Sequence, residues 1–324
     1  MRKGLTLGKY MPVHKGHLAL IDFAKQHCDL LYVLVCASDP QESISGKIRW
    51  EWMKKVCKGD SKVEVCYSDD PVPYTAHSSR EISQIWAAYL KPKFPDVTLF
   101  FSSEPYGDFL AEYMNIKHLT FNPQRDFVPI SATDIRNNPT KYYDYLPYQI
   151  QSDFVRKIAI VGAESTGKST LTQQLATHFH TLYVPEVARY MMQSSYDCTY
   201  ELLIKIAQRH AEEIIAQQKD AYKFLFCDTD LLVTMAYSEY LFQKTLLSEN
   251  WIQTANEMDL YLILDTDLSY HQDGTRLGNV FQSEIQKRII EKVINTNKPY
   301  VYINGKNEIR LENAIKQITD FFDL

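Results

Sequence analysis

The stretch KIAIVGAESTGKST, residues 157–170, runs from an apolar segment through a glycine-containing loop into a helix-like segment. It fits the spacing GxxxxGK[ST], which forms a phosphate-binding loop when a strand precedes it and a helix follows. Gly162 and Gly167 let the backbone curl so that N–H groups point at phosphate oxygens, and Lys168 adds a positive charge. The stretch therefore predicts an α/β domain that binds a nucleotide, with a glycine-rich turn that holds no ligand as the alternative.

Oxygen-bearing side chains accompany this loop. The hydroxyl of Ser169 is expected to ligate Mg²⁺ together with Asp228, which ends the apolar run FLFCD. Asp230 follows two residues later and is expected to contact the substrate, with a helix cap as the alternative for either aspartate. The residues expected to bind the nucleotide are Gly162, Glu164, Ser165, Thr166, Gly167, Lys168, Ser169 and Thr170.

A phosphate acceptor needs a carboxylate that orients its hydroxyl and takes the proton. Glu186, in the stretch VPEVARY, and Asp228 are the two candidates. Arg189 either holds the acceptor or pairs with Glu186. The polar loop LSYHQDGTRLGN, residues 268–279, carries Asp273 and Arg276, which suit a mobile lid that closes over the γ-phosphate; a solvated surface loop is the alternative.

The chain length of 324 residues favours two domains. Apolar runs alternate with helix-like segments in both halves, which predicts two doubly wound parallel sheets. The alternation breaks at NNPTKYYDYLPYQIQSDF, residues 137–154, so we expect one domain over residues 1–148 and a second over residues 153–324. The aromatic residues of the connecting stretch should pack along a domain surface.

The composition limits the partners and the location. A formal net charge of −5 gives no global attraction to nucleic acid or to anionic membranes, and no apolar window is long enough to span a bilayer. We therefore expect a cytoplasmic protein that binds neither nucleic acid nor membrane. The six cysteines lack a CxxC pair and suit buried, reduced thiols. The sequence leaves open whether the chain forms a homo-oligomer.

A second candidate site lies near the start of the chain, in GKYMPVHKGH, residues 8–17. A zinc site made from His14 and His17 would need further ligands, and none is close in sequence. A packed core is an unfavourable place for two histidines beside Lys15 and Gly16. A strand, a loop and a helix start would instead present N–H groups and two imidazoles to a phosphate chain.

These residues resemble the GxFxPxHxGH signature of the nucleotidyltransferase superfamily, with Tyr10 in place of the usual phenylalanine. The later stretch ISATDIRNNP, residues 130–139, resembles the ISxTxIR motif of the same superfamily. The resemblance implies a Rossmann-like domain in which Ser131 and Thr133 cap a phosphate-binding helix and Arg136 reaches the ATP phosphates. It assigns catalysis to His14, His17 and Arg136, and nucleotide binding to Gly8, Lys9, Tyr10, Gly16, Ser131 and Thr133.

The order of the two domains is similar to that of NadR-type bifunctional enzymes. This resemblance implies that the C-terminal P-loop kinase half phosphorylates nicotinamide riboside to NMN with ATP, and that the N-terminal half adenylylates NMN to NAD, both with Mg²⁺. Lys47 or Arg49 would assist the transferase, and Trp50, Trp86 or Tyr106 would stack on the nicotinamide ring, with core packing as the alternative for each aromatic. The helix-turn-helix repressor domain of some members is expected to be missing.

Two other functions fit the same motifs. The chain could be a riboside kinase whose N-terminal half only binds a nucleotide. It could also be a nucleotide-sensing regulator that controls a partner. The formation of NMN and NAD would distinguish these functions from the bifunctional enzyme.

Overall fold

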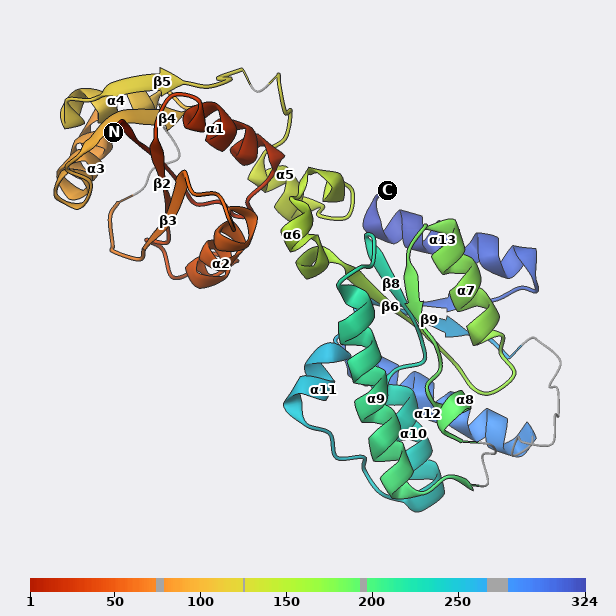
Figure 1. Cartoon of the computed structure of the whole chain (residues 1–324). Coiled ribbons are helices and arrows are strands. Elements are labelled where there is room, and N and C mark those ends of the chain that lie inside the picture. Colours follow the sequence, from red (N-terminus) through yellow and green to blue (C-terminus); the bar gives the residue numbers. More distant parts are fainter. Residues whose placement is uncertain (74–78, 125, 193–196, 267–278) are drawn as a thin grey trace. The chain divides into compact units, whose positions relative to one another are not determined.

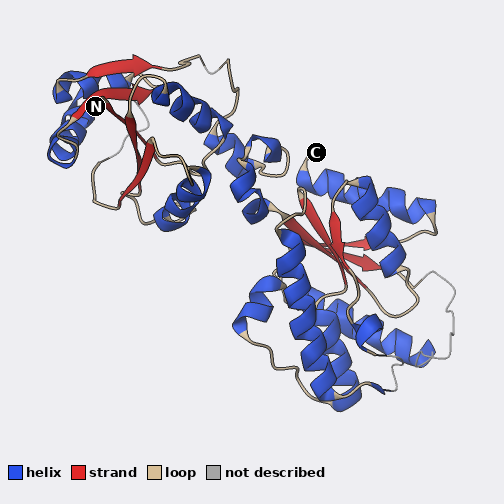
Figure 2. Ribbon diagram, in the orientation of Figure 1, coloured by secondary structure: helices blue, strands red, loops and turns tan. Residues whose placement is uncertain are grey.

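The computed structural model describes residues 1–73, 79–124, 126–192, 197–266 and 279–324. The chain divides into two compact units, Met1–Gln151 and Ser152–Leu324 (Figure 1). Each unit contains a five-stranded, fully parallel sheet with helices on both faces (Figure 2). The predicted fold class, two doubly wound parallel sheets, is confirmed.

The sheet of the first unit has the order β3-β2-β1-β4-β5, with β1 at its centre. Its strands are β1 (Lys3–Gly8), β2 (Leu30–Cys36), β3 (Val63–Ser68), β4 (Val97–Ser102) and β5 (Lys117–Thr120). Helices α1 (Lys15–Lys25) and α2 (Gly46–Val56) cover one face, and α3 (Arg80–Lys93) and α4 (Tyr106–Met114) cover the other (Figure 1). The chain changes direction across the sheet between β1 and β4, and ligands of such sheets bind beyond the carboxyl ends of strands at this point.

The second unit repeats this plan with the order β10-β9-β6-β8-β7 and β6 at the centre. Its strands are β6 (Arg156–Val161), β7 (Leu182–Val184), β8 (Phe224–Asp228), β9 (Leu260–Leu264) and β10 (Tyr300–Ile303). Helices α7 (Lys168–His178) and α13 (Glu308–Phe322) pack on one face. The other face carries α9 (Tyr200–Gln218), α10 (Leu231–Phe242) and α12 (Asn279–Asn295), with the short helices α8 (Ala188–Met191) and α11 (Asn250–Ala255) nearby (Figure 1).

The stretch that interrupts the sequence pattern packs mainly on the first unit. After α5 (Ala132–Asn137), a 3₁₀ turn at Tyr143–Tyr145 and helix α6 (Tyr148–Gln151) follow, and α6 contacts α2. Tyr143, Leu146 and Ile150 are fully buried, whereas Tyr148 is 80% exposed. The aromatic residues of this stretch therefore pack only in part, because a helix of one turn can bury only one of its faces.

The six cysteines form no disulfide. Cys28, Cys36 and Cys227 are buried, and the other three are half-buried. Burial raises the pKa of the Cys36 thiol to about 12, so this side chain stays protonated and behaves as a small apolar group. Within the described ranges, no helix combines the length and the apolar character that crossing a membrane requires.

Asp230 caps helix α10 in the interior of the second unit. Its carboxylate accepts the Val233 N–H at 3.1 Å and the Tyr261 hydroxyl at 3.0 Å, and the residue is only 1% exposed. The alternative considered from the sequence, a helix cap, therefore describes this side chain, because both oxygens are bound within the protein. Burial raises its pKa from 3.8 to about 6, and hydrogen bonding by Val233, Tyr261 and Leu232 only partly opposes this shift.

We expect Asp230→Asn to change how stability depends on pH. A carboxyl whose pKa is raised in the folded state stabilises the protein below its unfolded pKa, and this contribution is lost as the pH rises through the folded pKa. Asparagine also caps helices but stays neutral. The stability of the variant relative to the wild type should therefore grow by about 1–2 kcal/mol from about pH 5 to pH 8.

Thermal and chemical unfolding of the full chain measure this difference. Asp220→Asn, at an exposed position just after α9, is the control and should show the same pH dependence as the wild type. A constant difference between Asp230→Asn and the wild type across this pH range would contradict a raised pKa for Asp230.

Candidate functional site

His14 and His17 form the N-terminal cap of α1, directly beyond the carboxyl end of the central strand β1. The Nδ1 atom of His14 accepts the Gly16 N–H at 3.1 Å, and the Nδ1 atom of His17 accepts the His14 N–H at 3.2 Å. The two rings lie 3.8 Å apart between centroids. Because each ring accepts at Nδ1, its proton resides on Nε2, so both histidines carry an Nε2–H donor.

Small and aromatic neighbours hold these two rings in place. A Cβ atom at Gly16 would lie 3.0 Å from the His14 ring, so glycine lets the imidazole lie over the first turn of α1. The ring of Tyr10 is 3% exposed and meets His17 edge-on at 4.9 Å, and it also packs on Gly8. Burial holds the pKa of the Tyr10 hydroxyl well above its ordinary value. Tyr10 thus supports His17 from the core side.

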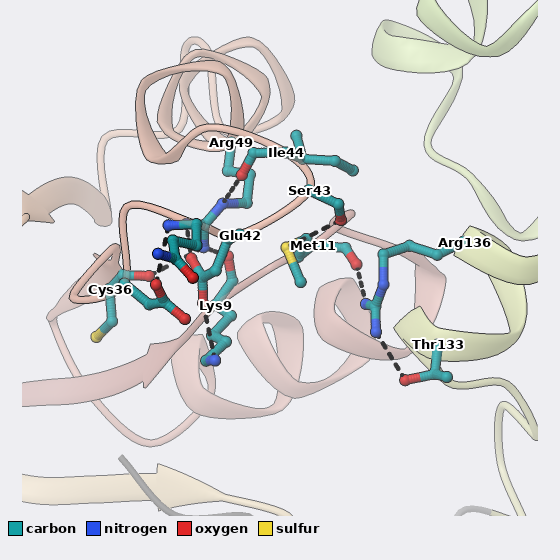
Figure 3. Close-up of polar contacts among 11 residues, drawn as sticks. Lys9, Met11, Cys36, Glu42, Ser43, Ile44, Arg49, Thr133 and Arg136 are labelled. Carbon is teal, nitrogen blue, oxygen red and sulfur yellow. Dashed lines mark hydrogen bonds and ion pairs between the residues drawn. The ribbon is translucent and has the colours of Figure 1, made fainter. Parts of the chain in front are cut away.

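The second motif reaches the first through Arg136. Ser131 caps α5 and forms a capping box with Asp134. The Arg136 guanidinium donates to the carbonyl oxygen of Met11, 125 residues earlier, and to the Thr133 hydroxyl at 2.9 Å (Figure 3). The structure therefore brings the two sequence motifs together beside the carboxyl end of β1, with a guanidinium between them.

Arg49 lies inside the first unit, where it connects three loops. It is 1% exposed, and its guanidinium forms an ion pair with Glu42 and donates to backbone carbonyl oxygens (Figure 3). These carbonyls belong to Lys9, Cys36 and Ile44. Glu42 also pairs with the Lys9 ammonium at 2.8 Å. Arg49, expected to contact the nucleotide, instead has its donors engaged within the protein and fixes the loop that carries Lys9.

The remaining candidates in the first unit lie in different surroundings. Trp86 is 9% exposed, and its Nε1–H donates to the Pro73 carbonyl at 2.9 Å, so the ring belongs to the core beside β4. Tyr106 packs against Phe100 of the same core. Lys47 is exposed in the first turn of α2. The packing alternative considered from the sequence therefore describes Trp86 and Tyr106.

In the second unit, the loop after β6 has the conformation expected of a phosphate cradle. Gly162, Ser165 and Gly167 have φ angles of 152°, 64° and 85°, and α7 begins at Lys168. A positive φ favours glycine, which explains two of these positions. The Lys168 ammonium is buried and donates to the Ala163 carbonyl at 3.0 Å. The loop thus folds back over its own lysine.

Three long side chains from later elements hold this loop. Gln286 of α12 accepts the Ala163 N–H at 2.7 Å and donates to the Leu264 carbonyl at the end of β9 at 2.9 Å. Gln282, one turn earlier, donates to the Glu164 carbonyl at 2.7 Å. Arg310 of α13 donates to the carbonyls of Thr166 and Gly305. Sequence reasoning missed all three, because a glutamine or arginine on a helix carries no local sign of a partner more than 100 residues away.

The loop's remaining side chains face different surroundings. The carboxylate of Glu164 accepts the Tyr237 hydroxyl at 3.3 Å, and Thr166 is buried and donates to the Ala163 carbonyl. Ser165 is half-buried, and Thr170 is exposed on the first turn of α7. Asp273 and Arg276, the predicted lid residues, lie outside the described residues.

Carboxylates of β7 and β8 meet the loop at the carboxyl edge of the sheet. Asp228 ends β8 and is 2% exposed, and burial together with Glu186 raises its pKa. The nearby Ser169 side chain lowers the pKa of Asp228 and so partly opposes this shift. Burial also disfavours ionisation of Glu186, but Lys168 and Arg189 outweigh it and hold its pKa below the ordinary value. Glu186 is therefore ionised near neutral pH, and its negative charge contributes to the raised pKa of Asp228.

Arg189 pairs with Glu186 through its Nε atom at 2.6 Å, while its side chain is 60% exposed.

Two oxygen atoms at this edge of the sheet, Ser169 Oγ and Asp228 Oδ1, are buried without a hydrogen-bond partner among the described residues. Hydroxyl and carboxylate oxygens are ligands that hard divalent cations prefer. Within the part of the chain that the structure describes, no group of three or more His, Cys, Asp or Glu side chains could hold a metal on its own.

Comparisons with known families match each unit separately. A cytidylyltransferase-like family model matches residues 5–138, and an AAA domain model matches residues 157–310. The first match contains both histidines and Arg136, and the second contains the phosphate-binding loop and both carboxylates.

Two relatives match almost the whole chain, and a third matches about half of it. The trifunctional NAD biosynthesis/regulator protein NadR of Salmonella typhimurium is 27% identical over 93% of this chain and 78% of its own length. The protein of the same name from Escherichia coli is 28% identical over 94% of this chain and 79% of its own length. The probable nicotinate-nucleotide adenylyltransferase of Azobacteroides pseudotrichonymphae is 24% identical over 51% of this chain and 90% of its own length.

Two crystal structures of NadR protein share the fold. One is a complex with NAD and AMP-PNP, with a TM-score of 0.74 and 16% identity, and the other is a complex with NR, with a TM-score of 0.75 and 17% identity. Each alignment covers 100% of this chain and 96% of the other. Over almost its whole length the chain is therefore similar to NadR proteins, and in it a cytidylyltransferase-like domain precedes a domain that matches an AAA family model and contains a P-loop.

Proposed function

We propose that the chain is a bifunctional enzyme of NAD biosynthesis. Its P-loop half phosphorylates nicotinamide riboside to NMN, and its nucleotidyltransferase half joins NMN to the adenylyl group of ATP, which yields NAD and pyrophosphate. One observation carries this proposal: each unit has its own anion-binding helix start beyond the central strand of its sheet, one built from His14 and His17 and the other from the P-loop. The NAD, AMP-PNP and NR complexes of NadR protein support the choice of substrates.

In the nucleotidyltransferase half, a phosphate oxygen of NMN attacks the α-phosphorus of ATP. A bond forms between these atoms, the bond to the bridging oxygen breaks, and pyrophosphate leaves. The Nε2–H groups of His14 and His17 and the Arg136 guanidinium donate to the phosphates, where negative charge grows on the leaving group. No side chain has to act as a nucleophile, so catalysis rests on positioning and on neutralisation of charge.

In the kinase half, the 5′-hydroxyl of the riboside attacks the γ-phosphorus of ATP, and ADP leaves. Glu186 is ionised and orients this hydroxyl and accepts its proton. The phosphates lie on the backbone N–H groups that begin α7, with Lys168 beside the γ-phosphate. The unpartnered oxygens of Ser169 and Asp228 fit a Mg²⁺ ion, which when bound would neutralise charge on the β- and γ-phosphates.

The two activities should be separable by substitution. The wild-type chain with ATP and Mg²⁺ should form NMN from nicotinamide riboside and NAD from NMN, as resolved by chromatography. Lys168→Ala should lower NMN formation by about a hundredfold or more, because a charge beside the transferred phosphoryl group is lost, and should leave NAD formation from NMN unchanged. NMN without NAD would instead indicate a kinase with a non-catalytic first half, and nucleotide binding without turnover would indicate a sensor.

The two histidines should act through Nε2 rather than through helix capping. Asparagine reaches only the position of Nδ1, so at position 14 or 17 it can accept the N–H group that the histidine accepts, but it places no donor where Nε2–H lies. His14→Asn and His17→Asn should therefore lower kcat for NAD formation by about 10²–10³-fold, while the melting temperature and riboside kinase activity stay near wild type. A large loss of stability with little loss of kcat would show that capping is their main role.

Gln286 should position the P-loop without contacting the substrate. Gln286→Met keeps the size of the side chain but leaves the Ala163 N–H and the Leu264 carbonyl without their partner. We expect the KM for ATP in the kinase reaction to rise about tenfold, and Gln286→Glu, which keeps the acceptor for Ala163, to recover part of this loss. Gln317→Met, on the exposed face of α13, should match the wild type. Equal kinetics for Gln286→Met and wild type would contradict this role.

A further inference from the structure

Some buried polar atoms of the second unit have no hydrogen-bond partner among the described residues, and three of them belong to the region around the carboxyl edge of its sheet. Within the described residues, Ser169 Oγ, Asp228 Oδ1 and His210 Nε2 are buried and make no hydrogen bond. The other groups of the second unit with such an atom already have partners: the guanidinium groups of Arg156 and Arg288 form ion pairs with carboxylates, and the carboxylate of Glu164 accepts the Tyr237 hydroxyl. Buried polar atoms without a partner are rare in folded proteins and call for an explanation. Ser169 and Asp228 are explained by the phosphate and cation site, whereas His210 is not.

His210 projects from the buried face of α9. The residue is 4% exposed, and its helix neighbours Ile206, Ala207 and Ala211 are core residues. Asn256 lies within hydrogen-bonding reach of the imidazole. The amide of Asn256 is itself fixed, since its oxygen accepts the Leu231 N–H at 3.1 Å and its nitrogen donates to the Ile252 carbonyl at 2.9 Å. Asn256 therefore lies beside the ring with its amide fixed by the backbone, and His210 Nε2 has no hydrogen-bond partner among the described residues.

His210 belongs to the same region as the two carboxylates of the site. Val187, directly after Glu186, packs in the same core cluster as Ile206 and Ala207 of α9. Glu186 also acts electrostatically on both His210 and Asp228, so the three groups lie near the carboxyl ends of β7 and β8. Ligands of parallel sheets bind beyond this edge. Burial lowers the pKa of His210 to about 4, and Asn256 and Glu186 only partly oppose this shift. Near neutral pH the ring is therefore uncharged.

The surroundings select the chemistry of a ligand for His210. A neutral imidazole nitrogen exchanges a hydrogen bond with an uncharged group such as a hydroxyl. Glu186 is ionised nearby, which disfavours a phosphate at this position and favours a hydroxyl-rich acceptor with a positive charge. An apolar side chain at this position of α9 would avoid the cost of an unsatisfied buried atom, so packing alone does not explain a histidine here.

We propose that His210 is an acceptor-binding residue of the kinase half, whose Nε2 atom hydrogen-bonds a ribose hydroxyl of nicotinamide riboside. This assignment rests on the proposed kinase function and adds the residue that recognises the sugar. Glu186 orients the 5′-hydroxyl, and His210 binds the 2′- or 3′-hydroxyl. His210 thereby contributes to the choice of ribosides over deoxyribosides.

Two conservative variants test this assignment, because they keep different parts of the imidazole. Glutamine places its terminal amide near the position of Nε2, whereas asparagine reaches only the position of Nδ1. His210→Asn should raise the KM for nicotinamide riboside about tenfold, with the KM for ATP unchanged within about twofold, and His210→Gln should recover most of this loss. His178→Asn, on the exposed part of α7, is the control and should match the wild type.

Deoxy analogues of the riboside separate contact from structure. For the wild type, the KM for either the 2′-deoxy or the 3′-deoxy form should exceed the KM for the riboside by the same factor by which His210→Asn raises the KM for the riboside. In the His210→Asn variant, the KM for that deoxy analogue should equal the KM for the riboside, because the same hydrogen bond is already absent. If the effects of the variant and of the missing hydroxyl on KM were additive with both analogues, the assignment would be overturned. Equal KM values for His210→Asn and wild type, or equal effects of the Asn and Gln variants, would overturn it as well.

The controls distinguish the failure of this assignment from the failure of the kinase function. A wild-type chain that forms no NMN from riboside and ATP would overturn the proposed function itself. A wild-type chain that forms NMN, together with unaltered His210 variants, would overturn only the role of His210. Melting temperatures of the full-length variants show whether a loss of activity reflects unfolding, and a rise in KM at unchanged melting temperature supports the contact.

Discussion

Both halves of the chain depend on a helix that begins directly beyond the central strand of a parallel sheet. β1 and β6 each lie third in their five-stranded sheets, and α1 and α7 follow them after short loops. The first N–H groups of such a helix have no partner within the helix, and the peptide dipoles add positive potential there. An anion bound at this point satisfies donors that would otherwise need another partner. The net charge of the chain is negative, so phosphate binding has to come from these two local features.

The two helix starts solve the same problem in different ways. At α7, glycine occupies the N-cap position and the backbone itself provides donors, with Lys168 buried behind the loop. At α1, His14 and His17 accept the first backbone N–H groups at Nδ1, so the donors offered to a ligand are the Nε2–H groups. In the proposed function, the first site binds phosphate through side chains and the second binds it through backbone. This difference explains why substitutions in the first site can preserve the helix cap while they remove the donor.

Much of the fold could be predicted because its signals are local. The core strands are short apolar runs such as LLYVLVC, and the motifs at residues 8–17 and 157–170 contain their own turn and helix start. What could not be predicted is which side chains meet across the fold. Arg49 and Trp86 belong to residue types that suit a nucleotide site, but their direction depends on the packing of α2 and α3, and both lie inside. Gln286 and Arg310 hold the P-loop from helices that follow it by more than 100 residues, and no spacing rule connects them to it.

The unpartnered polar atoms show where the second half gives up stability for binding. Each buried donor or acceptor without a partner costs about 1–3 kcal/mol in the folded protein, and Ser169, Asp228 and His210 each keep one. An apolar side chain at these positions would remove that cost, but a ligand would then find no polar atom. The ionised Glu186 adds an electrostatic cost, because its negative charge disfavours the ionised form of Asp228. A cation beside Asp228 and a hydroxyl beside His210 relieve both effects, so substrate binding and the stability of this half are thermodynamically linked.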